Sequence, residues 1–238
     1  MMEEVKQCLL CGSGTPETLG FYPSGEGVKL CECGLIYLSP RPSDAESYSD
    51  GTFDREVGRN TGEWDGRTEN KAKIRHDMVV GLCGDFKSIL DVGCSDGKFL
   101  DLLEGVDVMG IDPTTNRDEF IRGEFPQSMP KMMFDVITMF HSVEHVADPV
   151  DFISSTHKHL ADDGYLIVEY PDIGRRLMRD NVKLSAMLDN HFHLFEFTQK
   201  TMVTLLDKCG YDLQSIVCFS NDKNNTEYKN VAMIARKR

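Results

Sequence analysis

The sequence lacks any long hydrophobic run, and this absence excludes one broad class of protein. No apolar stretch approaches the roughly 18 residues that a helix needs to cross a bilayer. The first residues, MMEEVKQC, also lack the basic and then apolar layout of a secretion signal. We therefore expect a protein without a membrane span that resides in the cytoplasm.

Positive charge is also scarce. The 238 residues include 26 Lys and Arg against 39 Asp and Glu, so the formal net charge is −13. Proteins that wrap a phosphate backbone bind it mainly through Lys and Arg, so this balance argues against nucleic acid and favours a small substrate. At roughly 100–200 residues per domain, the length fits one sizeable domain with a small appendage.

A chain of this length and hydrophobic content does not need disulfides, yet it contains eight cysteines. Four of them form two close pairs, Cys8 with Cys11 and Cys31 with Cys33. Two such pairs separated by a short loop suit tetrahedral Zn²⁺, because each pair presents two thiolates from one tight turn. Four cysteine ligands leave no open position, so we expect a structural zinc. The other four cysteines are expected to fill the core.

The rest of the sequence alternates strand-like and helix-like segments. Short apolar runs such as SILDVG, FDVITMF and YLIVEY are typical of strands buried on both faces of a parallel sheet. The segment after Gly97 is predicted to be a helix ending at Gly105, and Asp148 and Thr198 are expected to cap two later helices. The last two strands form a hairpin-like pair that indicates an antiparallel edge. Together these patterns predict an open, mostly parallel α/β sheet.

The same patterns divide the chain into three parts. Residues 1–42 hold the cysteine pairs and end at Pro-Arg-Pro, a natural linker, so they are predicted to form a small zinc-ribbon-like module. Residues 43–69 are polar and are expected to be a linker or lid. A helical pattern begins at Asn70, so residues 70–238 are predicted to form the α/β domain.

The sharpest feature is ILDVGCSDGKFL, a strand that runs into a glycine-bearing turn. Gly93 permits a tight turn, Gly97 lets a ligand approach the backbone, and Asp91 can bind the ligand's cationic or hydroxyl side. About 20 residues later Asp112 ends the next strand, where a carboxylate accepts hydrogen bonds from ribose hydroxyls. A nicotinamide dinucleotide fits poorly, because the loop lacks the middle glycine of GxGxxG and its acids, Asp91 and Asp96, repel a pyrophosphate.

With these residues the sequence resembles the class I S-adenosylmethionine-dependent methyltransferases, whose motifs are a strand with an acid and a glycine turn, then an acid ending the next strand. The resemblance extends to FDVITMFHSVEHVADP and LADDGYLIVEYPD, and CLLCGSG and CECGLIYLSPRPS look like the cysteine-rich leader of bacterial small-molecule and sugar methyltransferases. It implies a Rossmann-like fold with a seven-stranded sheet. It also implies that S-adenosyl-L-methionine is bound by Asp91, Gly93, Cys94, Gly97, Asp112 and Phe140.

The stretch HSVEHV follows the strand FDVITMF, at the edge where open α/β sheets bind ligands. In a helical turn His141, Glu144 and His145 fall on one face, because residues three and four apart are neighbours. One interpretation makes a histidine the base that deprotonates the acceptor. A second makes the three residues a divalent-cation site, as in quinone-type O-methyltransferases, although these carry glutamate in place of His141. In a third, the Glu-His pair only shapes the loop.

Two further groups can contact a substrate. The family resemblance places DNHFHLFEFT over the mouth of the active site, where His193 can reach the acceptor; the plainer interpretation of His191 and His193 is that they pack or face solvent. The second group can bind an anionic substrate such as a sugar nucleotide, or simply form a solvated helix face. It consists of Arg175, Arg176 and Arg179.

We therefore predict an S-adenosylmethionine-dependent methyltransferase that acts on a small molecule or a sugar or glycan precursor, on oxygen rather than carbon. Two alternatives stay open. An RNA methyltransferase would use the zinc module to grip RNA, but residues 1–40 contain only Lys6 and Lys29 as basic residues. A non-catalytic protein would keep cofactor binding without the chemistry, for interaction with a partner.

Overall fold

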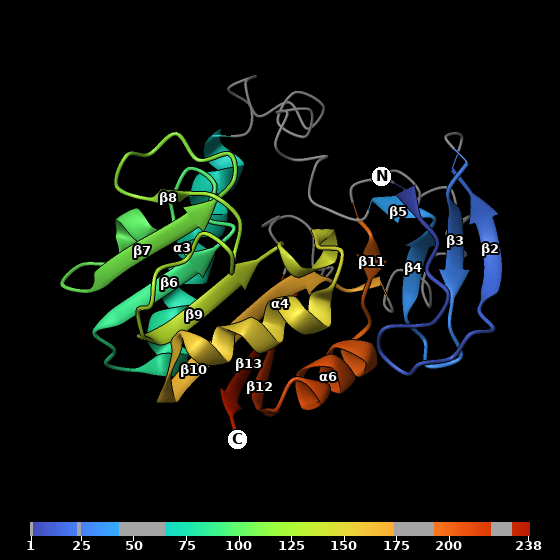
Figure 1. Ribbon diagram of the computed structural model, residues 1–238. Coiled ribbons are helices and arrows are strands. Elements are labelled where there is room, and N and C mark those ends of the chain that lie inside the picture. The colour runs from blue at the N-terminus through green and yellow to red at the C-terminus, as the bar shows by residue number, and fades with distance from the viewer. Residues whose placement is uncertain (1, 23–24, 43–64, 174–192, 220–229) are drawn as a thin grey trace.

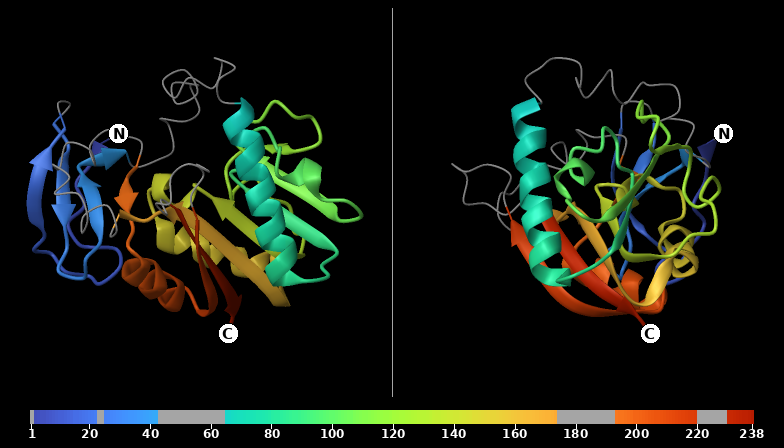
Figure 2. Two further views of the ribbon diagram at one scale, coloured as in Figure 1. Left: turned by 180° about the vertical axis from the view of Figure 1, so that it is seen from behind. Right: turned by 90° about the vertical axis from the view of Figure 1, so that its left-hand side faces the viewer.

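The structure is a computed structural model that describes residues 2–22, 25–42, 65–173, 193–219 and 230–238. Its main body is a seven-stranded sheet between helices, and a smaller sheet, built mostly from N-terminal residues, lies beside it (Figure 1). Helix α3 (Asp65–Cys83) covers one face of the large sheet, while α4 (Pro149–Ser155) and α6 (Gln199–Lys208) cover the other (Figure 2). Within these described ranges, no helix has the length and apolarity to cross a membrane.

The large sheet has the strand order β12-β13-β10-β9-β6-β7-β8. All neighbours pair in parallel except β13, which is antiparallel to both β10 and β12. The predicted fold class is confirmed, with the antiparallel strand one place in from the edge instead of at it. The strands are β6 Ser88–Val92, β7 Asp107–Asp112, β8 Ile121–Arg122, β9 Phe134–Phe140, β10 Leu160–Pro171, β12 Tyr211–Phe219 and β13 Asn230–Lys237.

Alternate residues of the central strands pack into two hydrophobic clusters, because successive side chains of a strand point to opposite faces. Leu90 and Ile137 join the cluster that includes residues of α4 and α6. Ile89 and Val136 join the cluster that includes Val79 of α3. Covered on both faces, these strands leave their carboxyl ends as the place where polar side chains can gather.

Two helix predictions need correction. Helix α3 begins at Asp65, so the last residues of the predicted linker 43–69 are helical. The predicted helix after Gly97 is only a 3₁₀ turn, η1 (Leu100–Leu102). Its length is limited on both sides, since Gly97 has a left-handed φ of +73° and Leu103 is already extended. The turn after β6 therefore lacks the helix N-terminus that the sequence had indicated.

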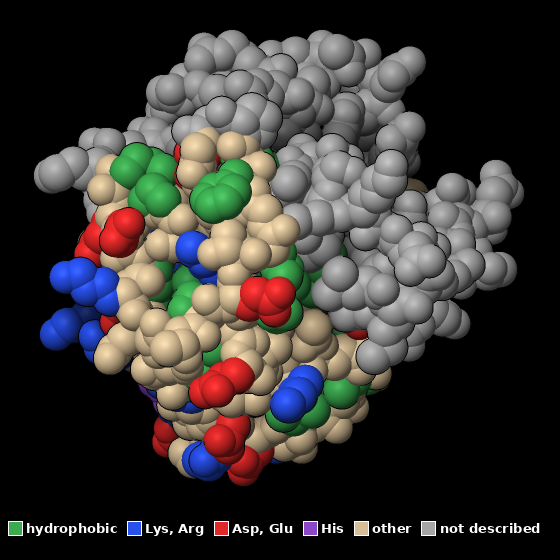
Figure 3. Space-filling view, turned by 90° about the vertical axis from the view of Figure 1, so that its right-hand side faces the viewer, with side chains coloured by type: hydrophobic (Ala, Val, Ile, Leu, Met, Phe, Trp, Pro, Cys, Tyr) green, Lys and Arg blue, Asp and Glu red, His purple; other side chains and the backbone are tan. Residues whose placement is uncertain are grey.

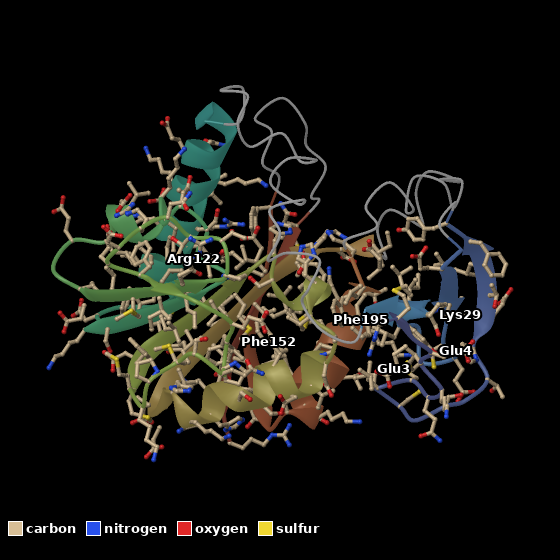
Figure 4. All side chains as sticks on the ribbon, turned by 45° about the horizontal axis from the view of Figure 1, so that its top comes forward. Glu3, Glu4, Lys29, Arg122, Phe152 and Phe195 are labelled. Carbon is tan, nitrogen blue, oxygen red and sulfur yellow. The ribbon has the colours of Figure 1, made fainter. Side chains whose placement is uncertain are left out.

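The N-terminal module forms a second sheet, with the order β11-β4-β3-β2, beside a short pair of β1 with β5. Its strands are β1 Met2–Glu3, β2 Glu17–Phe21, β3 Gly27–Leu30, β4 Ile36–Ser39 and β5 Arg41–Pro42. The fourth strand of this sheet, β11 (Phe195–Glu196), belongs to the predicted α/β domain, and Phe195 lies at the junction of the two parts (Figure 4). In addition, Lys208 of α6 donates hydrogen bonds to the carbonyls of Leu9 and Leu10. The module is thus built onto the domain.

Candidate active site

The glycine turn after β6 packs tightly against β7 and against neighbouring side chains. Gly93 has a φ of +83° and its amide donates a hydrogen bond to Ile111 O of β7 at 2.8 Å. A Cβ atom at Gly93 would overlap the Ser142 hydroxyl, and one at Gly97 would overlap the ring of Phe120. Both positions therefore require glycine, at Gly97 for the packing of a ring as well as for its backbone angle.

Asp112 ends β7 beside this turn, as predicted. Its Oδ2 accepts a hydrogen bond from the Ser95 amide at 2.9 Å. Its Oδ1 accepts from the amide and the hydroxyl of Thr114, at 2.7 and 2.8 Å. The carboxylate is mostly buried, and these donors hold it at the carboxyl ends of two neighbouring parallel strands.

Asp91 lies deeper, within β6. The Thr138 hydroxyl of β9 donates a hydrogen bond to its Oδ1 at 2.8 Å. Burial raises the pKa of Asp91 to about 7, because loss of solvent disfavours the charged form more than the Thr138 hydrogen bond and the Arg75 charge favour it. A carboxyl with this pKa changes its charge near neutral pH, unlike an ordinary aspartate.

The other two predicted cofactor residues pack against the same edge. The Cys94 thiol is buried against Gly110 and Phe120, and its pKa is raised by burial, so it is an unreactive filler and only its backbone faces the turn. Phe140 ends β9 and meets Phe99 edge-on, with ring centroids 5.0 Å apart. The Arg75 guanidinium lies over the Phe140 ring, 4.5 Å from its centroid.

A chain of charged side chains, two buried acids and two partly buried bases, crosses the sheet edge next to Phe140. Arg75 of α3 donates two hydrogen bonds to the fully buried Glu169 of β10, at 2.7 and 3.0 Å. Glu169 Oε1 lies 2.9 Å from His141 Nε2, and His141 Nδ1 lies 3.0 Å from Glu144 Oε1. With His141 protonated, the two cations and two anions balance.

The pKa values of this chain follow from the pairing. Burial alone would lower the pKa of His141, but Glu144 and Glu169 reverse this and raise it. Burial alone would raise the pKa of Glu144, but the hydrogen bond with His141 and the charge of His145 lower it to about 2. His141 is therefore held between two carboxylates, which leaves it poorly suited to act as a free base.

The three residues predicted on one face are only partly brought together. His141 has a left-handed φ of +55° and its ring turns to Glu169, while Val143–His145 form a 3₁₀ turn, η2. The third member of the cluster comes from another segment: candidate ligand atoms of Glu144, His145 and His193 all lie within 4.8 Å of one another. His193 Nδ1 lies 2.9 Å from Glu196 Oε1.

The sequence did not indicate Arg75 or Glu169 as site residues. The one signal for Glu169 was an acid inside the otherwise apolar strand YLIVEY. A carboxylate buried in such a strand requires a cationic partner, because an unpaired buried charge is costly. Three predicted groups, His191, the arginines of GRRLMRD and residues 43–64 of the predicted lid, lie outside the described residues.

The four N-terminal cysteines converge as predicted, with their Sγ atoms all within 4.8 Å of one another. The Cys8–Cys33 and Cys11–Cys31 sulfur distances are 3.8 and 3.3 Å. Four sulfurs held about 2.3 Å from one Zn²⁺ are about 3.8 Å apart, so the spacing fits a Cys₄ site. Hydrogen bonds from Gly12 N to Cys8 O and from Gly34 N to Cys31 O, both 2.8 Å, close the two turns.

This combination of an open parallel sheet, a glycine turn and an acid at the next strand end defines an α/β domain of the nucleotide-binding kind. The chain belongs to the methyltransferase-domain family, whose model matches residues 65–216. In sequence it is similar to a probable S-adenosylmethionine-dependent methyltransferase of Mycolicibacterium smegmatis, with 24% identity over 166 residues and 61% of each chain covered. It is also similar to the mitochondrial ubiquinone biosynthesis O-methyltransferase of Schizosaccharomyces pombe, with 25% identity over 161 residues, 56% of this chain and 58% of the relative.

The matched region thus spans about three fifths of the length of these curated relatives. Among solved structures, the 1,6-didemethyltoxoflavin-N1-methyltransferase of Burkholderia thailandensis superposes with a TM-score of 0.62 at 15% identity, covering 93% of this chain and 98% of that one. The plantazolicin methyltransferase BpumL gives a TM-score of 0.57 at 16% identity, covering 82% and 94%. These likenesses show the fold.

Proposed function

We propose that this protein transfers a methyl group from S-adenosyl-L-methionine to a small-molecule or sugar acceptor, at oxygen rather than carbon. Membership of the methyltransferase-domain family supports the reaction, and the curated relative named for this cofactor supports the donor. The observation that carries the proposal is the carboxylate of Asp112, fixed by Ser95 and Thr114 beside the glycine turn. When bound, the cofactor supplies an activated methyl group on a sulfonium sulfur.

The residues at the strand ends fit that cofactor. Asp112 would accept from the ribose hydroxyls, and Asp91 would face the ammonium group of the methionine part. The backbone of Gly93, Cys94 and Gly97 lines the same part. Phe140, which ends β9, would pack beside the reacting methyl group. The two buried acids Asp91 and Asp112 beside this turn suit a ligand that carries an amino group and hydroxyl groups.

The acceptor's proton would be removed close to Phe140. Methyl transfer needs the acceptor, the methyl carbon and the sulfur in line, and an oxygen acceptor must also lose its proton. We propose that the Glu144, His145 and His193 cluster promotes the loss of this proton, since His141 is held between two carboxylates. The charge chain from Arg75 to Glu144 fixes the position of the cluster.

We also propose that Cys8, Cys11, Cys31 and Cys33 bind a structural Zn²⁺. The sulfur spacing and the two closed turns support this site. Four thiolates occupy every tetrahedral position, so the ion stabilises the module and takes no substrate.

The face that the N-terminal module presents gives little support to an RNA substrate. Acidic and basic side chains are interspersed over the described part of the face that the N-terminal module presents (Figure 3). RNA binding through the backbone requires a continuous basic surface. A small acceptor remains the better proposal.

The proposal is tested by two measurements on the full chain. Calorimetric titration with S-adenosylmethionine and S-adenosylhomocysteine is expected to give one binding site. Candidate phenols, sugars and keto-enols are then incubated with S-adenosylmethionine and examined by mass spectrometry for the gain of one methylene unit. Absence of binding of either nucleoside would refute the proposal; binding without any methylated product would favour the non-catalytic alternative.

A further inference from the structure

We propose that Glu144, His145 and His193 bind a divalent transition-metal ion, distinct from the cysteine site, which coordinates an oxygen atom of the methyl acceptor. The metal site is inferred from the described residues alone. The role given to the metal rests on the proposed function.

The donor set and its spacing fit such an ion. Two imidazoles and one carboxylate are the ligands of many open metal sites that keep a position for water or substrate. Ligands around one Zn²⁺ lie about 3.4 Å apart, and the three candidate atoms lie within 4.8 Å of one another. The candidate ligand atoms therefore need to move closer together by at most about 1.4 Å.

The hydrogen bonds around the cluster orient the ligands in the way metal sites require. Glu196 binds His193 Nδ1 at 2.9 Å, which leaves Nε2 of that ring as the donor nitrogen. A carboxylate that holds the second nitrogen of a ligating histidine is a recurrent feature of metal sites. In the same way His141 binds Glu144 Oε1 at 3.0 Å and leaves Oε2 for the ion.

Glu144 supplies an independent indication of a ligand. Its side chain is only 1% exposed, and its Oε2 has no hydrogen-bond partner among the described residues. A buried carboxylate oxygen without a partner is costly, and a cation at this position would satisfy it. The rings of His145 and His193 meet edge-on, with centroids 4.9 Å apart, and both rings offer a nitrogen close to a Glu144 oxygen.

This assignment replaces one ligand expected from the sequence. His141 is excluded because its two nitrogens face Glu144 and Glu169. His193 takes its place, and its neighbour Leu194 fixes it by donating a backbone hydrogen bond to Glu144 O at 2.8 Å. Segments about 50 residues apart in the chain thus meet in one site.

A divalent ion at this site implies that the acceptor carries a hydroxyl or enol oxygen. Coordination to a divalent ion makes that hydroxyl more acidic, so its proton passes to water. The oxygen then forms a bond to the methyl carbon as the carbon–sulfur bond breaks, and the electron pair of that bond returns to sulfur. Atoms and charge balance without an oxidant or a reductant.

The test counts metal ions in the full chain. Protein whose cysteine site is filled with Zn²⁺ is titrated with Co²⁺, followed by calorimetry and visible absorption. We expect one further equivalent with d–d bands and no thiolate-to-cobalt band. His193→Gln should remove this equivalent, and Glu196→Gln should weaken it by about tenfold to a hundredfold. His76→Asn, on the exposed side of α3, is the matched control and should bind as wild type.

Two outcomes would overturn the metal site: no second equivalent in the wild type, or a second equivalent kept in full by His193→Gln. Glu144→Gln is the supporting variant, with circular dichroism as the check on folding. Binding of S-adenosylhomocysteine, measured on the same samples, separates the two proposals. If the nucleoside binds and Co²⁺ does not, only the metal site is refuted, and the reverse result refutes only the proposed function.

Discussion

The affinity for S-adenosylhomocysteine is expected to rise with pH, because Asp91 must be ionised to attract the ammonium group of the ligand. The pKa of this buried carboxyl is raised to about 7, so near neutral pH a large part of the ligand-free protein carries it uncharged. A ligand that prefers the ionised form releases a proton on binding below that pKa. Its affinity therefore increases as the pH rises through about 7 and levels off above it.

The size of the effect follows from the titration. A group with a pKa of about 7 is roughly one tenth ionised at pH 6 and nine tenths ionised at pH 8. If only the ionised form binds, the association constant is about tenfold higher at pH 8, which corresponds to about 1.4 kcal/mol. The folding stability of the ligand-free protein has the opposite pH dependence, because a raised carboxyl pKa favours the folded state at low pH. This contribution to stability is lost as the pH rises from about 4 to about 7.

The assay is isothermal titration calorimetry with S-adenosylhomocysteine at pH 6, 7 and 8, in two buffers of different ionisation enthalpy at each pH. The buffers give the number of protons released, which should approach one at pH 6 and fall towards zero at pH 8. Asp91→Asn removes the titrating group and should remove the tenfold change. Asp96→Asn alters an exposed acid of the same turn and should keep it. An equal pH dependence in wild type and Asp91→Asn would refute the reasoning.

Three further predictions follow from the site. Asp112→Ala should weaken binding of S-adenosylhomocysteine by more than tenfold in calorimetry, since it removes the acceptor for the ribose hydroxyls; unchanged affinity would exclude Asp112 from the site. Arg75→Ala leaves Glu169 buried without its guanidinium and should lower the free energy of unfolding in urea by about 3 kcal/mol, whereas a loss below about 1 kcal/mol would show that the pair contributes little. Chelation should release one Zn²⁺ per chain and lower the melting temperature, and Cys33→Ser should reproduce this while Cys218→Ser does not; native protein without zinc by metal analysis would contradict the site.

Local signals in the sequence predicted the elements that depend on neighbouring residues. Asp148 caps α4 by accepting hydrogen bonds from Val150 N and Asp151 N, both at 2.9 Å, and Thr198 caps α6 through a reciprocal bond with Thr201. The central strands were recognisable because burial on both faces requires continuous apolar residues. The predicted helix after Gly97 was wrong because a helical pattern of apolar residues does not report backbone angles.

Contacts between distant segments could not be predicted in the same way. Arg75 and Glu169 are 94 residues apart, and no periodicity connects them. The turn of His141 away from His145 depends on its left-handed φ, which is uncommon for a non-glycine residue and is favoured here by two carboxylates that face the ring. The sequence therefore indicated the residue types at the sheet edge, and the tertiary structure selects which of them share a site.

The same argument applies to the junction of the two sheets, where the cysteine module takes part in building the candidate active site. Cys31 N binds Leu35 O at 2.9 Å, so the second cysteine turn leads directly into β4. From β4, Leu38 N donates to Leu194 O at 3.0 Å, and Leu194 N in turn donates to Glu144 O at 2.8 Å. His193 precedes Leu194, so its position beside Glu144 depends on β4 keeping its register. A zinc ion that fixes the cysteine turns would therefore stabilise the acceptor side of the site while remaining outside it.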